Sequence, residues 1–233
     1  MRKKGGEVMR KLLGAVLVLA IFVLGTFPAA AVSPNSLIED SIDVLRAMRD
    51  QDDARNMADV VEGAHAVAFV PSMVKAGFIL GGEYGEGLIL RKENGKWYGP
   101  SFYNLGGGSL GFQIGAQKIS LILVVTNEKG VEAFLSSKTK LGGDVSVAAG
   151  PVGRRAEAAT DAQMKASIYS YSMTKGLFAG LSLEGSVISI SVKRNEEYWK
   201  KKISAADALR KPADDKRIRP LVEELGRLAK RAR

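Results

Sequence analysis

Apolar residues between positions 35 and 63 recur every three or four residues, which is the spacing of one helical face. The repeating positions are Ile38, Ile42, Leu45, Met48, Met57, Val60 and Val61. Ser36 with Glu39 three residues on has the form of a capping box, and Gly63 is a typical residue after a helix end. The pattern therefore predicts a helical segment over residues 32–63.

From Ala64 the pattern changes to short apolar runs separated by glycine, proline and asparagine, which is typical of strands. We expect strands near 66–70, 75–82, 85–92, 96–102, 109–117, 118–127, 145–150, 166–173 and 177–192. Pro71 should stop the first, and Asn94-Gly95 should form a two-residue hairpin turn, because a type I′ turn needs positive φ at both positions. Residues 128–136 predict a short helix.

The remaining pattern is helical again. Asn195 is the expected cap of a helix through residues 196–202, and the chain is expected to stay helical to its end. Short strands joined by turns favour antiparallel pairing. The fold class predicted is α+β: a curved antiparallel sheet of about eight strands, open or closed as a barrel, in a core of residues 64–194. The helices of 32–63 and 195–233 belong to the same domain.

The first 31 residues have the order of a secretory signal peptide. A basic leader precedes an apolar run from Leu12 to Gly25, and Ala29 and Ala31 form an A-x-A cleavage site. Cleavage after Ala31 would export the protein to the periplasm or cell envelope. The alternative is an uncleaved N-terminal anchor, because the weakly apolar stretch is about long enough to span a bilayer.

Charge and composition exclude several classes of protein. The chain has no cysteine, so it has no disulfide and no thiol nucleophile, and it has one histidine, His65. The net charge is +9, but residues 32–206 hold 20 basic and 19 acidic residues, so the excess lies at the two ends. A nearly neutral folded core argues against nucleic acid as a partner. No spacing of ligands predicts a metal or a cofactor.

Several long motifs then carry a family resemblance. Residues 70–91 (VPSMVKAGFILGGEYGEGLILR), 95–117, 141–154 and 170–186 (SYSMTKGLFAGLSLEGS) resemble, in order, the SYLF family, also called Ysc-type lipid-binding domains. The resemblance implies a lipid-binding fold. Its eukaryotic members bind phosphoinositides, some also engage actin, and its bacterial members are exported. This chain departs from the family at Met173, where an arginine is usual, and at Lys118, where an aspartate is frequent.

One role of the eukaryotic relatives does not transfer to this chain. In those relatives a basic amphipathic helix before the core assists membrane binding. Here residues 35–63 hold three arginines against eight acidic residues, so anionic lipid would repel this segment.

Motifs with catalytic forms have simpler interpretations. Ser72 and Lys75 form an S-x-x-K pair, the spacing of serine acyl hydrolases, but the partner motifs are missing and the segment is strand-like. The glycine-rich residues 106–111 lack the following helix that a phosphate loop needs. His65 is expected to be a hydrogen-bonded structural residue. We therefore predict a protein that is not an enzyme, with a serine hydrolase using Ser72 and Lys75 as the weakest alternative.

The expected lipid-binding residues are basic. Pro220 suits the start of a C-terminal helix with one apolar face, and such basic amphipathic helices bind membrane surfaces. The candidates there are Arg217, Arg219, Arg227, Lys230 and Arg231, and those in the core are Lys75, Arg154, Arg155 and Lys175. The alternative for the helix is docking on the sheet by the same apolar face.

The sequence thus predicts non-catalytic binding of anionic lipid or a membrane surface at the cell envelope. A structural envelope protein that assembles with itself or with a protein partner is the alternative from another class. Neither the lipid nor the partner follows from the residues.

Overall fold

A nine-stranded sheet organises the structure, a computed structural model that describes residues 32–51, 54–77, 80–110, 115–151 and 165–232. The predicted signal peptide, Arg154 and Arg155 lie outside the described residues. Residues Ser33–Arg233 form one compact unit.

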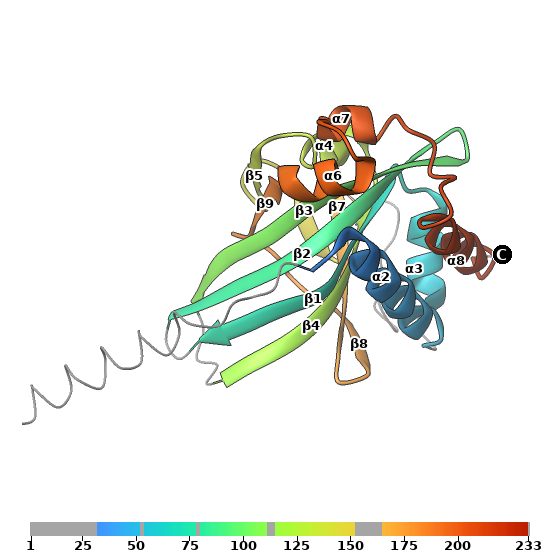
Figure 1. The fold of residues 1–233 in the computed structure, drawn as a ribbon. Helices are drawn as coiled ribbons and strands as arrows, with labels where there is room; N and C mark the ends of the chain where they lie inside the picture. Colours follow the sequence, from blue (N-terminus) through green and yellow to red (C-terminus); the bar gives the residue numbers. More distant parts are fainter. Residues whose placement is uncertain (1–31, 52–53, 78–79, 111–114, 152–164, 233) are drawn as a thin grey trace, which may run out of the picture. The chain divides into compact units, whose positions relative to one another are not determined.

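The strands follow the chain as β1 (Ala66–Gly77), β2 (Leu80–Glu93), β3 (Lys96–Leu110), β4 (Gly115–Val125), β5 (Lys138–Lys140), β6 (Val147–Ala149), β7 (Ile168–Thr174), β8 (Leu177–Gly180) and β9 (Val187–Ile190). Their order across the sheet is β5-β9-β3-β2-β1-β4-β7-β6, with β8 paired to β7. The sheet curls into a half-barrel whose long central strands are β1 to β4 (Figure 1). The predicted α+β class with a curved sheet is confirmed.

One strand pair corrects the expectation of a wholly antiparallel sheet. β6 and β7 run parallel, with Val147 opposite Ile168. Parallel neighbours need a crossover of a dozen or more residues, and the chain between β6 and β7 is long enough to provide one. The sequence pattern alone did not distinguish this connection from a long antiparallel loop.

The sequence predicted that Pro71 would end the first strand, and this prediction is wrong. The strand continues through Pro71 because a bulge accommodates the proline. The register shifts between Phe69 and Ser72 on the β2 side and between Val70 and Met73 on the β4 side. Proline has no N–H to donate to a ladder, and bulges are among the positions that tolerate it. The Asn94-Gly95 hairpin is confirmed, with φ values of 51° and 75°.

The helices are α2 (Pro34–Arg49), α3 (Ala54–Glu62), α4 (Glu128–Glu132), α6 (Val192–Trp199), α7 (Ala205–Ala208) and α8 (Arg219–Ala229). Ser33, not Ser36, caps α2: its hydroxyl accepts from the Ser36 N–H at 3.1 Å. The prediction of continuous C-terminal helix is wrong, since α6, α7 and α8 are separate. Asn195 is also not a cap. It lies inside α6, where its side-chain amide accepts a hydrogen bond from the Phe102 N–H and donates one to the Phe102 carbonyl.

Two apolar clusters lie on opposite faces of the sheet. The inner cluster receives Leu141 and Val147, from the two ends of the strand order, and so fills the inside of the curl. The outer cluster joins the other face of β1 to β4 to α2, α3, α6 and α8. Gly87 shows how tight the strands are: a Cβ there would meet the Tyr103 ring at 2.6 Å.

The helices cover only one end of the outer face. Figure 1 shows two groups, α2 with α3 and α8, and α6 with α4 and α7, while the far end of β1, β2 and β4 and the β7–β8 hairpin project beyond both groups. Within the described ranges, no helix has the length and apolar character needed to cross a bilayer.

Candidate lipid-binding site

Helix α8 carries most of the basic residues that the sequence assigned to lipid binding, but its apolar face is already used. Leu221, Leu225 and Leu228 are buried in the outer cluster, and α8 packs against α2 and α3. The helix is therefore docked by its apolar face, as the alternative expected, but on α2 and α3 and not on the sheet. The apolar half of an amphipathic membrane helix is therefore not available while α8 is docked.

A buried carboxylate fixes α8 to the acidic first helix. Glu224 is 1% exposed and accepts from Arg46 at 2.9 Å, Arg49 at 2.5 Å and Arg227 at 2.6 Å. Burial acts to raise the pKa of Glu224, but the hydrogen bond from Arg46 and the three guanidinium charges outweigh it and lower the pKa. We call these four residues the Glu224 cluster.

The other predicted C-terminal residues also make contacts within the chain. Arg217 lies 3.8 Å from the centre of the Tyr198 ring and pairs with Asp215 at 2.8 Å, and its hydrogen bonds hold the pKa of Asp215 at about 2. Arg219 donates to a backbone carbonyl at 2.9 Å, and Arg231 donates to the backbone of α2.

Lys230 is exposed and has no ion-pair partner in the described ranges. Lipid binding by these five residues stays a prediction, but four of them already have contacts within the chain.

Ser72 and Lys75 do not form a catalytic pair. Both lie on β1, three residues apart, so their side chains leave opposite faces of the strand. The Lys75 ammonium instead pairs with the carboxylate of Glu83 at 3.4 Å, and Ser186 also donates to Glu83. Lys75 thus neutralises a buried carboxylate within the sheet, and the geometry gives no support to the serine-hydrolase alternative.

His65 and the glycine-rich stretch have the structural roles expected for them. The His65 Nδ1 lies 3.0 Å from Glu128, and this hydrogen bond is the main reason that the pKa of Glu128 is lowered. Residues 106–110 belong to β3, so they form no phosphate loop there.

The uncovered end of the sheet exposes apolar side chains beside a lysine. Val74 on β1 faces Tyr84 on β2 and Lys118 on β4 in register. Val74 and Tyr84 are 49% and 51% exposed, and Lys118 is exposed. The three therefore form one row across the sheet.

The β7–β8 hairpin repeats this combination at its tip. Lys175 and Gly176 form the turn, with φ values of 51° and 80°. Leu177 follows and is 75% exposed, the highest value among the exposed large hydrophobic residues of the described chain. Behind the tip, Phe178 stacks on Tyr171 with the rings 5.7 Å apart, which supports the hairpin.

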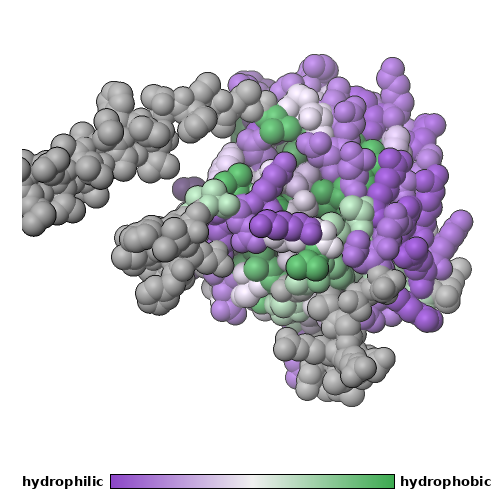
Figure 2. All heavy atoms as spheres, turned by 90° about the horizontal axis from the view of Figure 1, so that it is seen from below, coloured by the Kyte–Doolittle hydropathy of each residue, from purple (hydrophilic) through white to green (hydrophobic). Residues whose placement is uncertain are grey.

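These residues share one end of the sheet but not one face. Phe178 pairs with Met173 toward the outer cluster, so Leu177, which pairs with Thr174, leaves the other face. We call the set of Val74, Tyr84, Lys118, Lys175 and Leu177 the sheet-end surface. Figure 2 views the molecule from below and shows hydrophobic residues gathered at the surface beside hydrophilic ones. The β4–β7 ladder pairs Ser120 with Met173, so Lys118 and Lys175, each two residues further along, lie toward the same end of the sheet.

A polar cluster anchors Tyr84 within this surface. Its hydroxyl lies 3.1 Å from Glu86 and 3.3 Å from Asn104, and Arg194 on α6 pairs with Glu86. Partial burial, then the Glu86 charge, raises the pKa of Tyr84. Tyr84 is therefore neutral at physiological pH, and its half-exposed ring presents an amphipathic group of the type found at membrane interfaces.

Comparison with known proteins identifies the family to which this chain belongs. Residues 106–228 match the family described as "Ysc84: Las17-binding protein actin regulator". Over 185 residues, 76% of the chain, it is 33% identical to SH3 domain-containing YSC84-like protein 1 of Rattus norvegicus and 32% identical to that of Homo sapiens. It is 37% identical over 145 residues, 60% of the chain, to LAS seventeen-binding protein 3 of Saccharomyces cerevisiae.

The chain belongs to the Ysc84-like, or SYLF, domain family. It spans 54% of the length of the mammalian relatives and 31% of the yeast one. The resemblance expected from the motifs is confirmed at the level of the family.

Sequence reasoning found Lys175 but missed the apolar members of the sheet-end surface. Val74 and Leu177 belong to ordinary strand patterns, and nothing in an alternating pattern says which end of a strand a helix will cover. The Glu224 cluster was also missed, because two of its three arginines, Arg46 and Arg49, lie 178 and 175 residues before Glu224.

Proposed function

We propose that this protein is a non-catalytic module that binds anionic membrane surfaces through the sheet-end surface. The observation that carries the proposal is the hairpin tip, where Leu177 is 75% exposed next to Lys175. An apolar side chain held in solvent beside a lysine matches the boundary between acyl chains and anionic headgroups. The resemblance of the sequence motifs to Ysc-type lipid-binding domains supports the same function.

The expected affinity is modest. Full burial of a leucine contributes about 1.5–3 kcal/mol, and each lysine near an anionic surface contributes about 1 kcal/mol. Leu177 with partial burial of Val74 and Tyr84, together with Lys118 and Lys175, gives roughly 5 kcal/mol, a Kd between about 1 mM and 1 μM. Binding should therefore be reversible and should weaken with salt, because surface charges are screened.

We further propose that the protein acts outside the cytoplasm, at the cell envelope. The support is the leader, apolar run and Ala29/Ala31 site at the start of the chain. N-terminal sequencing of protein from the envelope fraction should begin at or near Val32. Recovery of protein with an intact Met1 from soluble cytoplasm would overturn the proposed export.

Binding of a protein partner is the second candidate, supported by the family description as a Las17-binding actin regulator. The same exposed apolar side chains could contact a protein or a second copy of the chain. Liposome flotation of protein from residue 33 onward separates the two. Membrane binding predicts co-flotation with anionic vesicles and not with neutral ones; absence of flotation, with a stable dimer in sedimentation, would favour the second candidate.

A further inference from the structure

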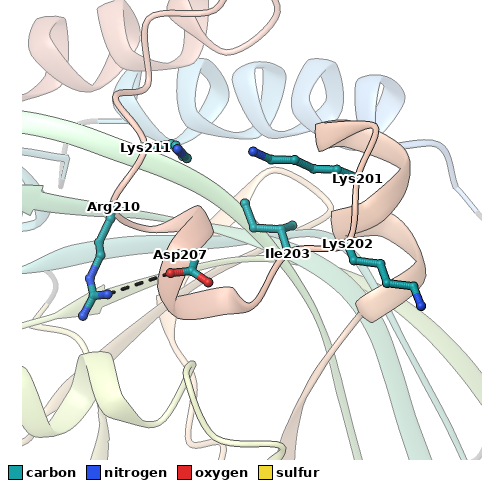
Figure 3. A pocket seen from close by; sticks show the side chains of 6 residues that line it. All are labelled: Lys201, Lys202, Ile203, Asp207, Arg210 and Lys211. Atoms are coloured by element: carbon teal, nitrogen blue, oxygen red, sulfur yellow. Dashed lines mark ion pairs between the residues drawn. The ribbon is translucent and has the colours of Figure 1, made fainter.

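A basic hollow lies between α6 and α7, away from the sheet-end surface. It is open to solvent, has a volume of about 330 Å³, and is lined by Lys201, Lys202, Ile203, Asp207, Arg210 and Lys211. In Figure 3 the Lys201 side chain extends toward Lys211, Ile203 lies below them, and Lys202 extends away. A volume of this size lies at the lower end of the range for small-molecule sites.

The two walls of the hollow are tied to adjacent residues of β3. On one side, the indole of Trp199, the last residue of α6, donates to the Pro100 carbonyl at 3.1 Å. On the other, the Gly99 N–H donates to the Lys211 carbonyl at 2.8 Å. Lys200 has a φ of 57°, which turns the chain sharply at the end of α6. The backbone that carries Lys201 and Lys211 is therefore held in place before any ligand binds.

The floor of the hollow is also fixed. Ala205, Ala208 and Leu209 are buried and anchor α7, and the Ser204 hydroxyl accepts from the Asp207 N–H at 3.0 Å. Ile203 is half-buried. Flexible lysine stems thus extend from a rigid frame, which lowers the entropy cost of bringing their charges together on a ligand.

The charges in the hollow are not balanced within the chain. Four basic residues and one carboxylate line the hollow. Asp207 lies 3.8 Å from Arg210 and also accepts from Ser204 at 2.7 Å. Lys201 and Lys211 have no ion-pair partner in the parts of the chain that the structure describes. Like charges held near one another destabilise a fold, and a bound anion removes that cost.

We propose that this hollow is a binding site for a compact anion that carries two phosphate groups. Ammonium groups are compact point charges with three donors each, which suit tetrahedral phosphate oxygens. Lys201 and Lys211 contact one phosphate each, the apolar side of Ile203 packs beneath the ligand, and Arg210 stays beside Asp207. The phosphates come from a free diphosphate or from a phosphomonoester lipid headgroup, and the test below separates these sources.

The test compares two double variants with the same change in charge. Lys201→Gln with Lys211→Gln removes the facing ammonium groups. Lys129→Gln with Lys138→Gln removes two exposed lysines elsewhere. Isothermal titration with inorganic diphosphate should give saturable binding for the unmodified protein, about 30-fold weaker binding for the first variant, and a change under about threefold for the second. Unchanged circular dichroism and Tm establish that both are folded.

Vesicles provide the second arm. Flotation uses phosphatidylcholine vesicles with phosphatidic acid, a phosphomonoester, or with phosphatidylglycerol, a diester. Diphosphate binding lost in the first variant supports a soluble ligand. Preference for phosphatidic acid, lost in the same variant, supports a headgroup ligand. Equal losses in both variants, or no dependence on Lys201 and Lys211 in either arm, would overturn the site. Leu177→Ser should leave diphosphate titration unchanged, so failure of the membrane proposal and failure of this one are distinguishable.

Discussion

Helix α8 and the β7–β8 hairpin both place apolar side chains beside basic ones, yet the fold treats them in opposite ways. Leu221, Leu225 and Leu228 are buried against α2 and α3, and the neighbouring arginines pair within the chain. Leu177 is 75% exposed beside Lys175. An amphipathic pattern therefore predicts that one face is buried, but only the tertiary structure shows which part of the protein, or which partner, buries it.

The largest contrast should be in stability. Leu225→Ala removes a side chain that is 1% exposed from the outer cluster, so we expect a loss of about 2–5 kcal/mol in the free energy of unfolding. Leu177→Ala should change it by less than about 0.5 kcal/mol. Denaturant titration followed by circular dichroism measures both. Equal losses would mean that the hairpin tip is packed and not exposed.

The Glu224 cluster should give the next largest effect. Glu224→Gln leaves three guanidinium groups with a weaker acceptor, and we expect a loss of about 2 kcal/mol at pH 7. Glu223→Gln, a change to an exposed neighbour on the same helix, is the matched control. If Tm falls equally in both variants, the cluster does not hold α8.

The pH dependence of the same variant has a definite sign. The folded-state pKa of Glu224 is lowered, so its contribution is fully present above the ordinary glutamate pKa and is lost as pH falls through the folded-state value. The difference in Tm between unmodified protein and Glu224→Gln should therefore shrink on acidification. A difference that grows in acid would contradict the ion pairs as its source.

The last contrast concerns charge at the sheet end, where the predicted effect is largest at low salt and smaller at high salt. Lys118→Gln with Lys175→Gln should weaken binding to anionic vesicles by about 2 kcal/mol at low salt, roughly 30-fold, and by much less at high salt. Replacing Arg217 and Arg219 by glutamine should weaken vesicle binding less, because both arginines already have partners in the chain. Flotation across a salt series measures both. If the arginine pair causes the larger loss of vesicle affinity, the membrane-binding site lies on the C-terminal segment.

The sequence predicts the elements of this fold better than it predicts their contacts. The Asn94-Gly95 turn and the short helix after Asn127 follow from local backbone chemistry, and both are present. The prediction for Pro71 was wrong because the bulge leaves no ladder hydrogen bond for its missing N–H to make. The prediction for Asn195 was wrong because a residue type common at helix caps can also serve as a buried hydrogen-bond partner. These exceptions depend on neighbours distant in sequence.

The candidate sites were harder to predict for the same reason. Counting charge separately on either side of residue 206 placed the three lysines after Trp199 in the neutral core and Arg210 and Lys211 in the basic tail. The fold brings the two groups to one hollow. The run of three consecutive lysines was the sequence signal for a basic site. The segment that completes the hollow, Arg210 and Lys211, is evident only from the structure, in which α7 turns the chain back.

The central claim is that the membrane contact lies at the sheet end and not on α8 or elsewhere on the surface. One flotation experiment on anionic vesicles compares Lys175→Gln with Leu177→Ser against Lys230→Gln with Val192→Ser; Val192 is 58% exposed at the start of α6. Each double variant removes one exposed lysine and one exposed apolar side chain. The first should bind about 100-fold more weakly, and the second should bind as the unmodified protein does. The reverse order, with both variants folded, would contradict the account.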